Sequence, residues 1–261
     1  MLTYRNVEGF WCVGFWAFGR GLKPETGLVR KFHKEGYKVA ILDMNEERGK
    51  ALTEELKNTI FIPVNVTDEK QVENAIKETV SKFGPLHVVV NSAGIAWSGV
   101  LVTSKGVLKN DMFNLIMNVN VLGTFNVCKY AAQQMMSQDI VNKQFGRGVI
   151  INVASVAGIE GQTGQTIYSA SKGAIIGMTL PMARDLGRSQ IRVNTIAPGV
   201  IHTPMSSHMN DRVRVAIEAN VAFGRLGESD EFADCVFGMV NSSYVNGAVI
   251  RLDGGTRLGM L

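Results

Sequence analysis

Short runs of apolar residues alternate with longer amphipathic stretches along the 261-residue chain. The apolar runs are continuous rather than alternating, which is typical of strands buried on both faces of a sheet. We predict strands at these runs, over residues 10–14, 38–43, 60–66, 86–91, 148–153, 191–196 and 248–252. Such strands would lie at the centre of the fold.

The stretches between the apolar runs carry apolar residues at helical spacing. They predict helices over residues 26–35, 46–57, 68–83, 111–137, 165–186 and 229–240. Residues 98–109 show no clear period. Residues 203–222 predict a helical excursion that serves as a substrate lid.

Strands that alternate with helices form parallel sheets with crossovers on both faces. The sequence therefore predicts an α/β fold, namely a Rossmann-type doubly wound parallel sheet of about seven strands with helices on both faces. We expect residues 1–261 to form a single domain. Ligands of such a sheet bind beyond the carboxyl ends of the strands.

Composition narrows the classes of function. The chain is 46% hydrophobic and carries a net charge of +4. This mildly basic balance suits anionic small ligands, and without a run of like charges it does not imply nucleic acid. No apolar run approaches the ~18 residues that span a bilayer, so no membrane contact is expected. Three cysteines without a paired motif favour a reduced compartment, and four histidines without ligand spacing indicate no metal site.

Tyr168 and Lys172 stand four residues apart in a predicted helix and therefore share one helix face. An ammonium beside a phenol favours the phenolate, because opposite charges stabilise one another. Such a tyrosine can exchange a proton with an alcohol or a ketone. The same spacing also occurs in ordinary surface pairs, so the surrounding residues decide whether this pair is catalytic.

Two polar residues supply that context. Ser155 follows the predicted strand 148–153, where its hydroxyl can donate to a substrate oxygen. Asn120 lies in an apolar helical stretch and needs polar partners, which a water-mediated link to Lys172 would provide. Each residue alone has a structural explanation, but together with Tyr168 they favour a catalytic site.

The order of these motifs resembles the short-chain dehydrogenase/reductase family. The chain has the turn Asn91-Ser92-Ala93-Gly94, then Asn120, Ser155, the Tyr168/Lys172 pair and the turn Pro198-Gly199. The resemblance spans residues 38 to 255. It implies reversible hydride transfer with a nicotinamide dinucleotide and a catalytic tetrad of Ser155, Tyr168, Lys172 and Asn120.

Asp43 ends the second predicted strand, where a carboxylate can accept hydrogen bonds from ribose hydroxyls and repel a 2′-phosphate. This favours NAD over NADP, although an Asp at a strand end can also be a simple helix cap. The family resemblance implies the remaining cofactor contacts. These are Gly14, Gly19, Gly21, Asn65, Val66, Asn91, Ala93, Gly94, Tyr168, Lys172, Pro198, Gly199 and Thr203.

The first glycine loop departs from the family pattern T-G-x-x-x-G-x-G. Val13 stands where Thr is usual, one extra residue separates Gly14 from Gly19, and bulky Phe15, Trp16 and Phe18 occupy the turn. Glycines allow backbone N–H groups to approach a pyrophosphate there. Three explanations stay open: a remodelled loop that still binds, a reading-frame or splice error, and lost cofactor binding.

A narrower resemblance is to the 3-hydroxyacyl-CoA dehydrogenase type 2 branch, carried by stretches such as VLGTFNV, IRVNTIAPG and GAVIRLDGG. It implies an acyl-CoA thioester or steroid substrate shaped by Gln162 and Gln165, a homotetramer and a mitochondrial location, with a cytoplasmic one as the alternative. It also implies RNA-processing partners. Two rival functions remain open, a non-catalytic scaffold in a mitochondrial tRNA-processing complex and a general carbonyl or steroid reductase.

Overall fold

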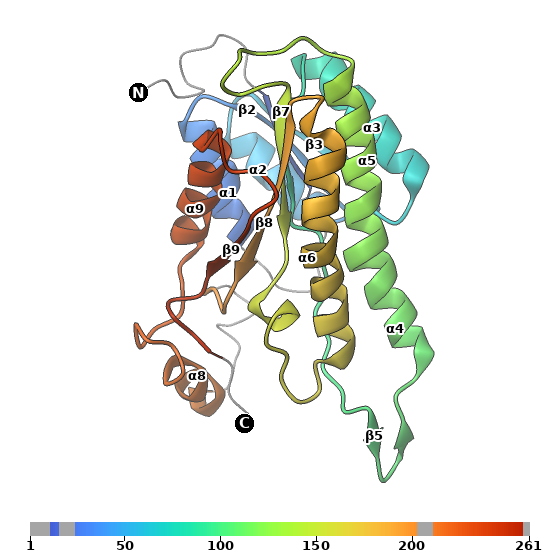
Figure 1. The fold of residues 1–261 in the computed structure, drawn as a ribbon, viewed down its shortest axis with the longest axis vertical. Coiled ribbons are helices and arrows are strands. Elements are labelled where there is room, and N and C mark those ends of the chain that lie inside the picture. The colour runs from blue at the N-terminus through green and yellow to red at the C-terminus, as the bar shows by residue number, and fades with distance from the viewer. Residues whose placement is uncertain (1–10, 16–23, 203–210, 258–261) are drawn as a thin grey trace.

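A seven-stranded parallel sheet forms the centre of the molecule (Figure 1). The computed structural model describes residues 11–15, 24–202 and 211–257. The strands lie in the order β3-β2-β1-β4-β7-β8-β9, and every neighbouring pair is parallel. They are β1 (Trp11–Phe15), β2 (Lys38–Asp43), β3 (Thr59–Pro63), β4 (Val88–Asn91), β7 (Gly148–Val153), β8 (Ile191–Pro198) and β9 (Val249–Leu252). The predicted doubly wound fold is confirmed.

Helices cover both faces of this sheet. The described helices are α1 (Pro24–Lys34), α2 (Glu46–Glu55), α3 (Glu69–Phe83), α4 (Asn110–Met117), α5 (Gly123–Met136), α6 (Thr166–Gly187), α8 (Asp211–Glu218) and α9 (Ser229–Asn241). One buried cluster joins the sheet to α3, α5 and α6, and a second joins it to α1 and α9. Figure 1 shows α1 and α9 on one side of the sheet and α5 and α6 on the other.

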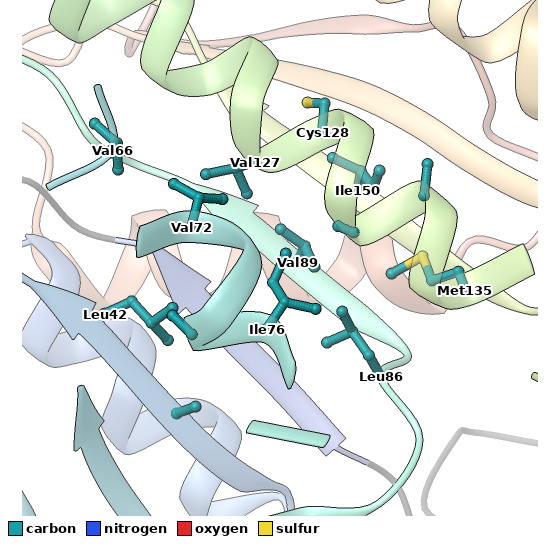
Figure 2. Close-up of a cluster of buried hydrophobic side chains, with 14 of the residues drawn as sticks. Leu42, Val66, Val72, Ile76, Leu86, Val89, Val127, Cys128, Met135 and Ile150 are labelled. Atoms are coloured by element: carbon teal, nitrogen blue, oxygen red, sulfur yellow. The ribbon is translucent and has the colours of Figure 1, made fainter. Parts of the chain in front are cut away.

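Successive strand residues enter opposite cores. On β4, Val89 packs in the cluster with α3 and α5, whereas Val88 and Val90 pack in the cluster with α1 and α9. Figure 2 shows the first cluster, where Val89 and Ile150 lie between the sheet and the side chains of Ile76 and Val127. Because both faces are covered, both alternating sets are apolar, which explains the continuous apolar runs.

The sheet brings one end of all its strands to a common edge. β1 pairs with β2 on one side and β4 on the other, so the strand order reverses between β1 and β4. Asn91 at the end of β4 is in register with Asn152, and Val153 with Ile196. Residues that follow β2, β4, β7 and β8 therefore meet at the carboxyl edge, where ligands of this fold bind.

Three sequence predictions need correction. The segment 98–109 is not irregular throughout, because β5 (Val102–Thr103) and β6 (Gly106–Val107) form an antiparallel hairpin. The predicted helix 111–137 is interrupted by a π-helical turn at Asn118–Leu122. The third strand ends at Pro63 rather than at residue 66, and proline lacks the N–H that would continue its ladder.

Other boundaries agree within a few residues of the sequence prediction. Asp68 caps α3 by accepting hydrogen bonds from the backbone N–H groups of Lys70 and Gln71. α8 falls inside the expected excursion 203–222, of which residues 203–210 lie outside the described residues. In the described part of the chain, none of the helices has the combination of length and hydropathy that a membrane crossing requires.

Candidate active site

Ser155 and Tyr168 meet at the carboxyl edge of the sheet. Ser155 follows β7 and caps a short 3₁₀ helix at Val156–Gly158, where its Oγ accepts a hydrogen bond of 3.1 Å from the Ala157 N–H. Tyr168 lies in the first turn of α6, and its phenol is hydrogen-bonded to the Ser155 side chain. Burial raises the pKa of the Tyr168 phenol above its ordinary value, and this hydrogen bond opposes the rise.

Lys172 is buried one helical turn after Tyr168. Its Nζ lies 5.8 Å from the centroid of the Tyr168 ring and donates a hydrogen bond of 2.9 Å to the Val153 carbonyl. Burial lowers the pKa of the Lys172 ammonium to about 8. With that pKa the group is mostly protonated at neutral pH, so a positive charge faces the phenol.

Asn120 occupies the centre of the π-helical turn and is fully buried. Its Oδ1 accepts a bond of 2.8 Å from the Ile95 N–H, while Nδ2 donates to the Ile95 carbonyl at 3.0 Å and to the Ser171 hydroxyl at 2.9 Å. Direct protein partners therefore hold this side chain in place, and the water-mediated link to Lys172 stays a prediction. π-helical turns are frequent at functional sites.

Gly94 separates Asn120 from Lys172. A Cβ added at Gly94 would lie 3.3 Å from Asn120 Oδ1 and 3.3 Å from Lys172 Nζ. The two polar atoms therefore flank one small space that only a residue without a side chain leaves open. Ala93, beside it, is buried in the core with α3 and α5.

Asp43 is almost fully buried at the end of β2, with 1% exposure. Its Oδ1 accepts a bond of 2.7 Å from the Asn45 N–H, whereas its Oδ2 is buried without a hydrogen-bond partner. Burial raises the pKa of the Asp43 carboxyl to about 7. A buried acceptor without a donor costs free energy, so this oxygen fits a ligand that brings hydroxyl donors.

Several expected cofactor residues lie at the same edge with their polar groups engaged. Asn65 Oδ1 accepts from the N–H and hydroxyl of Thr67, and the Val66 carbonyl accepts from Asn126 Nδ2. Pro198 ends β8, and the Gly199 N–H donates to the Leu252 carbonyl at 2.9 Å. These contacts hold the loops around the edge in place.

Asn91 does not direct its side chain to this edge. Its Nδ2 donates to Asn152 Oδ1 at 2.8 Å and to Cys128 Sγ at 3.2 Å, inside the layer between the sheet and α5. Cys128 is a free thiol there. Any contact of Asn91 with a cofactor would therefore be made by its backbone.

Gln162 and Gln165 lie together in the loop before α6. The Gln162 N–H donates to Gln165 Oε1 at 3.2 Å, and both side chains are partly exposed. Gly14 lies within β1, in register with Ile41 and Val90. Gly19, Gly21 and Thr203 lie outside the described residues.

Sequence reasoning did not single out Ser171. This residue is fully buried, accepts from Asn120 and donates a bond of 2.7 Å to the Tyr168 carbonyl. Its position three residues after Tyr168 places it on the inner side of α6, which was the available signal. In the described part of the chain, acidic, histidine and cysteine side chains do not gather in a metal-binding group.

A doubly wound sheet with this serine, tyrosine and lysine at its carboxyl edge defines an oxidoreductase of the nicotinamide-dinucleotide class. A family model described as enoyl-(acyl carrier protein) reductase matches residues 26–257. Rat 3-hydroxyacyl-CoA dehydrogenase type-2 is 43% identical over 249 residues, which cover 93% of this chain and 92% of the rat protein. The chain belongs to the short-chain dehydrogenase/reductase family, as its motifs indicated.

Two solved structures show the same fold. The crystal structure of 3-hydroxyacyl-CoA dehydrogenase type-2 from Mycobacterium avium has a TM-score of 0.91 and 35% sequence identity, covering 98% of this chain and 99% of that one. ElxO with NADP bound has a TM-score of 0.82 and 29% identity, covering 94% and 98% of the two chains. The family binds a nicotinamide dinucleotide, and these relatives do not distinguish NAD from NADP.

Proposed function

We propose that this chain interconverts a secondary alcohol and a ketone on 3-hydroxyacyl-CoA thioesters, with NAD(H) as the hydride carrier. The observation that supports it is the contact of Ser155 with Tyr168 beside the buried Lys172 ammonium. The similarity to 3-hydroxyacyl-CoA dehydrogenases type-2 supports the choice of substrate class.

Tyr168 is the acid/base residue of this proposal. In the oxidative direction its phenolate takes the proton of the substrate hydroxyl, and the hydrogen on the same carbon leaves with its electron pair. When bound, the nicotinamide ring supplies the acceptor for that hydride. Ser155 holds the substrate oxygen by donating a hydrogen bond to it, at the place where negative charge develops.

Lys172 and Asn120 support the proton transfer. The Lys172 ammonium, 5.8 Å from the centroid of the Tyr168 ring, would favour the phenolate, since a nearby cation stabilises it. Its Nζ would also bind the nicotinamide ribose. Asn120 Oδ1 faces the same space beside Gly94 as Lys172 Nζ, which supports a role in holding a relay water.

Asp43 supports NAD as the cofactor. Its unpaired, buried Oδ2 would accept a hydrogen bond from an adenosine ribose hydroxyl. The same oxygen would meet a 2′-phosphate with like charge. ElxO holds NADP, so the proposed preference for NAD rests on Asp43 and not on this relative.

The other expected contacts complete the proposed cofactor site. Ala93 and Gly94 would approach the dinucleotide from the end of β4, and Pro198 and Gly199 from the end of β8. Gly14, Gly19, Gly21 and Thr203 remain family assignments. A loop remodelled around these glycines is the explanation of the sequence departure that agrees with this proposal.

Gln162 and Gln165 are proposed to shape the substrate site, because their loop leads directly into Tyr168. Residues 203–222 are the proposed lid, and residues 1–261 a single domain. We also propose a homotetramer in mitochondria. Exposed apolar side chains on α4, the π-helical turn and α5 support a subunit interface; they are Phe113, Leu115, Leu122 and Phe125.

The rival functions predict different behaviour. A scaffold without catalysis is not favoured, because the matched relatives are oxidoreductases and the chain retains Ser155, Tyr168 and Lys172 together. RNA-processing partners stay a prediction from the resemblance. A general carbonyl or steroid reductase would prefer free ketones or steroids over CoA thioesters in a substrate panel.

The proposed role of Tyr168 is tested by Tyr168→Phe. Removing the phenol should lower kcat by roughly 10²–10⁴-fold, the usual contribution of a general acid or base. NADH binding, followed by fluorescence titration, and thermal unfolding should stay close to wild type. A variant that keeps most of its turnover would exclude Tyr168 as the acid/base residue.

A further inference from the structure

The segment between Ser155 and Tyr168 packs directly on the helix that carries Tyr168 and Lys172. A Cβ at Gly158 would lie 2.7 Å from the Lys172 backbone carbon and 2.9 Å from the Gly173 nitrogen. A Cβ at Gly161 would lie 2.5 Å from Ser169 Oγ. Any shift of this segment therefore changes how Ser155, Gln162 and Gln165 sit relative to Tyr168.

Glu160 lies in the middle of this segment and is bound by Arg251 from β9. Arg251 Nη1 donates to Glu160 Oε1 at 2.6 Å, and Nη2 approaches Oε2 at 3.4 Å. The two residues are 91 positions apart in the sequence. The ion pair therefore ties the segment to β9, the last strand of the sheet.

Arg251 is itself fixed by the turn after β9. Its Nε donates to Asp253 Oδ2 at 2.7 Å, and its Nη2 donates to the Thr256 carbonyl at 2.9 Å. This turn adjoins the end of β8, where a Cβ at Gly199 would lie 3.1 Å from the Asp253 Cα. The guanidinium thus joins the segment before Tyr168 to the loop after Pro198.

The setting makes this ion pair stronger than a surface pair. The side chains of Arg251, Glu160 and Asp253 are 22%, 26% and 9% exposed, so water screens them less than exposed charges. Several charge-assisted hydrogen bonds share one planar guanidinium, whose fixed fork a lysine ammonium does not reproduce.

We propose that Arg251 is a positioning residue for the reaction: through Glu160 it fixes the segment that carries Ser155, Gln162 and Gln165 against Tyr168. The inference rests on the proposed oxidoreductase function. In this role Arg251 contacts neither the reacting atoms of the substrate nor the phenol of Tyr168. It acts through the placement of the residues that do.

The test compares Arg251→Lys, Arg251→Met and Glu160→Gln in the full-length protein, with a short 3-oxoacyl-CoA and NADH as substrates. Each variant should lower kcat by roughly tenfold to a hundredfold, since displacements near 1 Å have effects of this size. The dissociation constant for NADH should change less than threefold. Glu160→Gln combined with Arg251→Met should lose little more kcat than Arg251→Met alone, because the main link is already broken and the remaining contact of Glu160 with Arg257 is long, at 3.8 Å.

The matched control is another Arg–Glu pair, between Arg30 on α1 and Glu55 at the end of α2. It also makes two contacts, one of them 2.6 Å between Nη2 and Oε2, but both side chains are 48% exposed and the pair lies away from the carboxyl edge. Arg30→Met should leave kcat unchanged. Equal losses of kcat in Arg30→Met and Arg251→Met would show a general stability effect and overturn the proposal.

Other outcomes separate this inference from the proposed function. Wild-type turnover together with unchanged kcat in Arg251→Lys and Glu160→Gln would overturn the positioning role alone. An inactive, folded wild-type protein would overturn both. If Arg251→Met does not fold, Arg251→Lys and Glu160→Gln decide, because each retains most of the side-chain volume.

Discussion

Asn120 donates a hydrogen bond of 2.9 Å to the Ser171 hydroxyl, and Ser171 donates in turn to the Tyr168 carbonyl at 2.7 Å. The π-helical turn is thereby connected to the first turn of α6. Ser171 thus bridges two proposed catalytic residues, through the side-chain amide of Asn120 and the backbone carbonyl of Tyr168.

Ser171→Ala should therefore disturb both stability and turnover. It leaves a buried Asn120 donor without one of its partners, which costs about 1–3 kcal/mol of unfolding free energy. We expect a lower kcat as well, because Tyr168 loses a support of its backbone. Denaturant unfolding and steady-state kinetics measure the two effects.

Ser169→Ala is the matched control for this prediction. Ser169 lies on the same helix, and its buried Oγ has no hydrogen-bond partner. Removing that hydroxyl should leave stability unchanged or raise it. A Ser171→Ala protein that behaves like Ser169→Ala would show that the bridge has no energetic importance.

Gly94→Ala should lower activity while the protein stays folded. The added methyl group would stand 3.3 Å from both Asn120 Oδ1 and Lys172 Nζ, in the space proposed for the relay water. We expect kcat to fall by roughly tenfold or more, since misplaced catalytic groups have effects of this order. Stopped-flow measurement of hydride transfer would locate the loss in the chemical step.

Gly177→Ala on α6 provides the comparison. A Cβ there meets nothing within 4 Å, and alanine favours a helix over glycine by about 0.5–1 kcal/mol. This variant should be slightly more stable and equally active. An unchanged kcat in Gly94→Ala would contradict the proposed relay space.

Asp43→Asn should stabilise the protein at neutral and higher pH. The folded-state pKa of about 7 lies above the reference value of 3.8, so folding favours the protonated carboxyl. Wild-type stability therefore falls as pH rises from about 4 to 7, by an amount on the order of 3 kcal/mol. The advantage of the variant should vanish below pH about 4, where the carboxyl is protonated in both states.

The same substitution tests the cofactor preference. NADH and NADPH titrations of Asp43→Asn should show weaker discrimination, because the charge that opposes a 2′-phosphate is gone. Asp139→Asn removes one exposed charge and should change neither property. Wild-type protein that binds NADPH as tightly as NADH would refute the assignment to Asp43.

Arg192→Met should unfold at a much lower temperature without a change in mechanism. The buried Arg192 guanidinium donates to the carbonyls at and beyond the end of α9, which are those of Met239, Val240, Ser242 and Val245. Loss of these bonds leaves buried carbonyls without donors, which costs about 1–3 kcal/mol for each. Calorimetry of Arg192→Met beside the exposed Arg188→Met checks this, and equal melting temperatures would contradict it.

The strands were predictable because burial leaves a local signature. Residues 38–43 and 148–153 match β2 and β7 at both ends, and the apolar residues inside these runs pack alternately into the two cores. Asn91 could also have been oriented from its spacing. It lies two residues after Val89, so its side chain enters the same α5 layer and not the ligand edge.

The remaining features depend on contacts that have no local pattern. The hairpin β5–β6 has strands of two residues with exposed side chains, and strands this short leave no clear period in the sequence. The partners of Asn120 come from Ile95 and Ser171, and Glu160 meets Arg251 only in the folded chain. The apolar surroundings of Asn120 indicated that it needs polar partners, but the tertiary structure decided which ones.

The π-helical turn at Asn118–Leu122 also sets the rotation of α4 relative to α5 about the helix axis. One additional residue in a helix turns everything before it by roughly 100° relative to everything after it. Deleting one residue from this turn would give a regular helix that is more favourable by itself, yet α4 and the β5–β6 hairpin beyond its end would swing around the helix axis (Figure 1). The number of residues in the π-helical turn therefore fixes the orientation of α4 and the β5–β6 hairpin relative to α5, and it matters as much as which residues the turn contains.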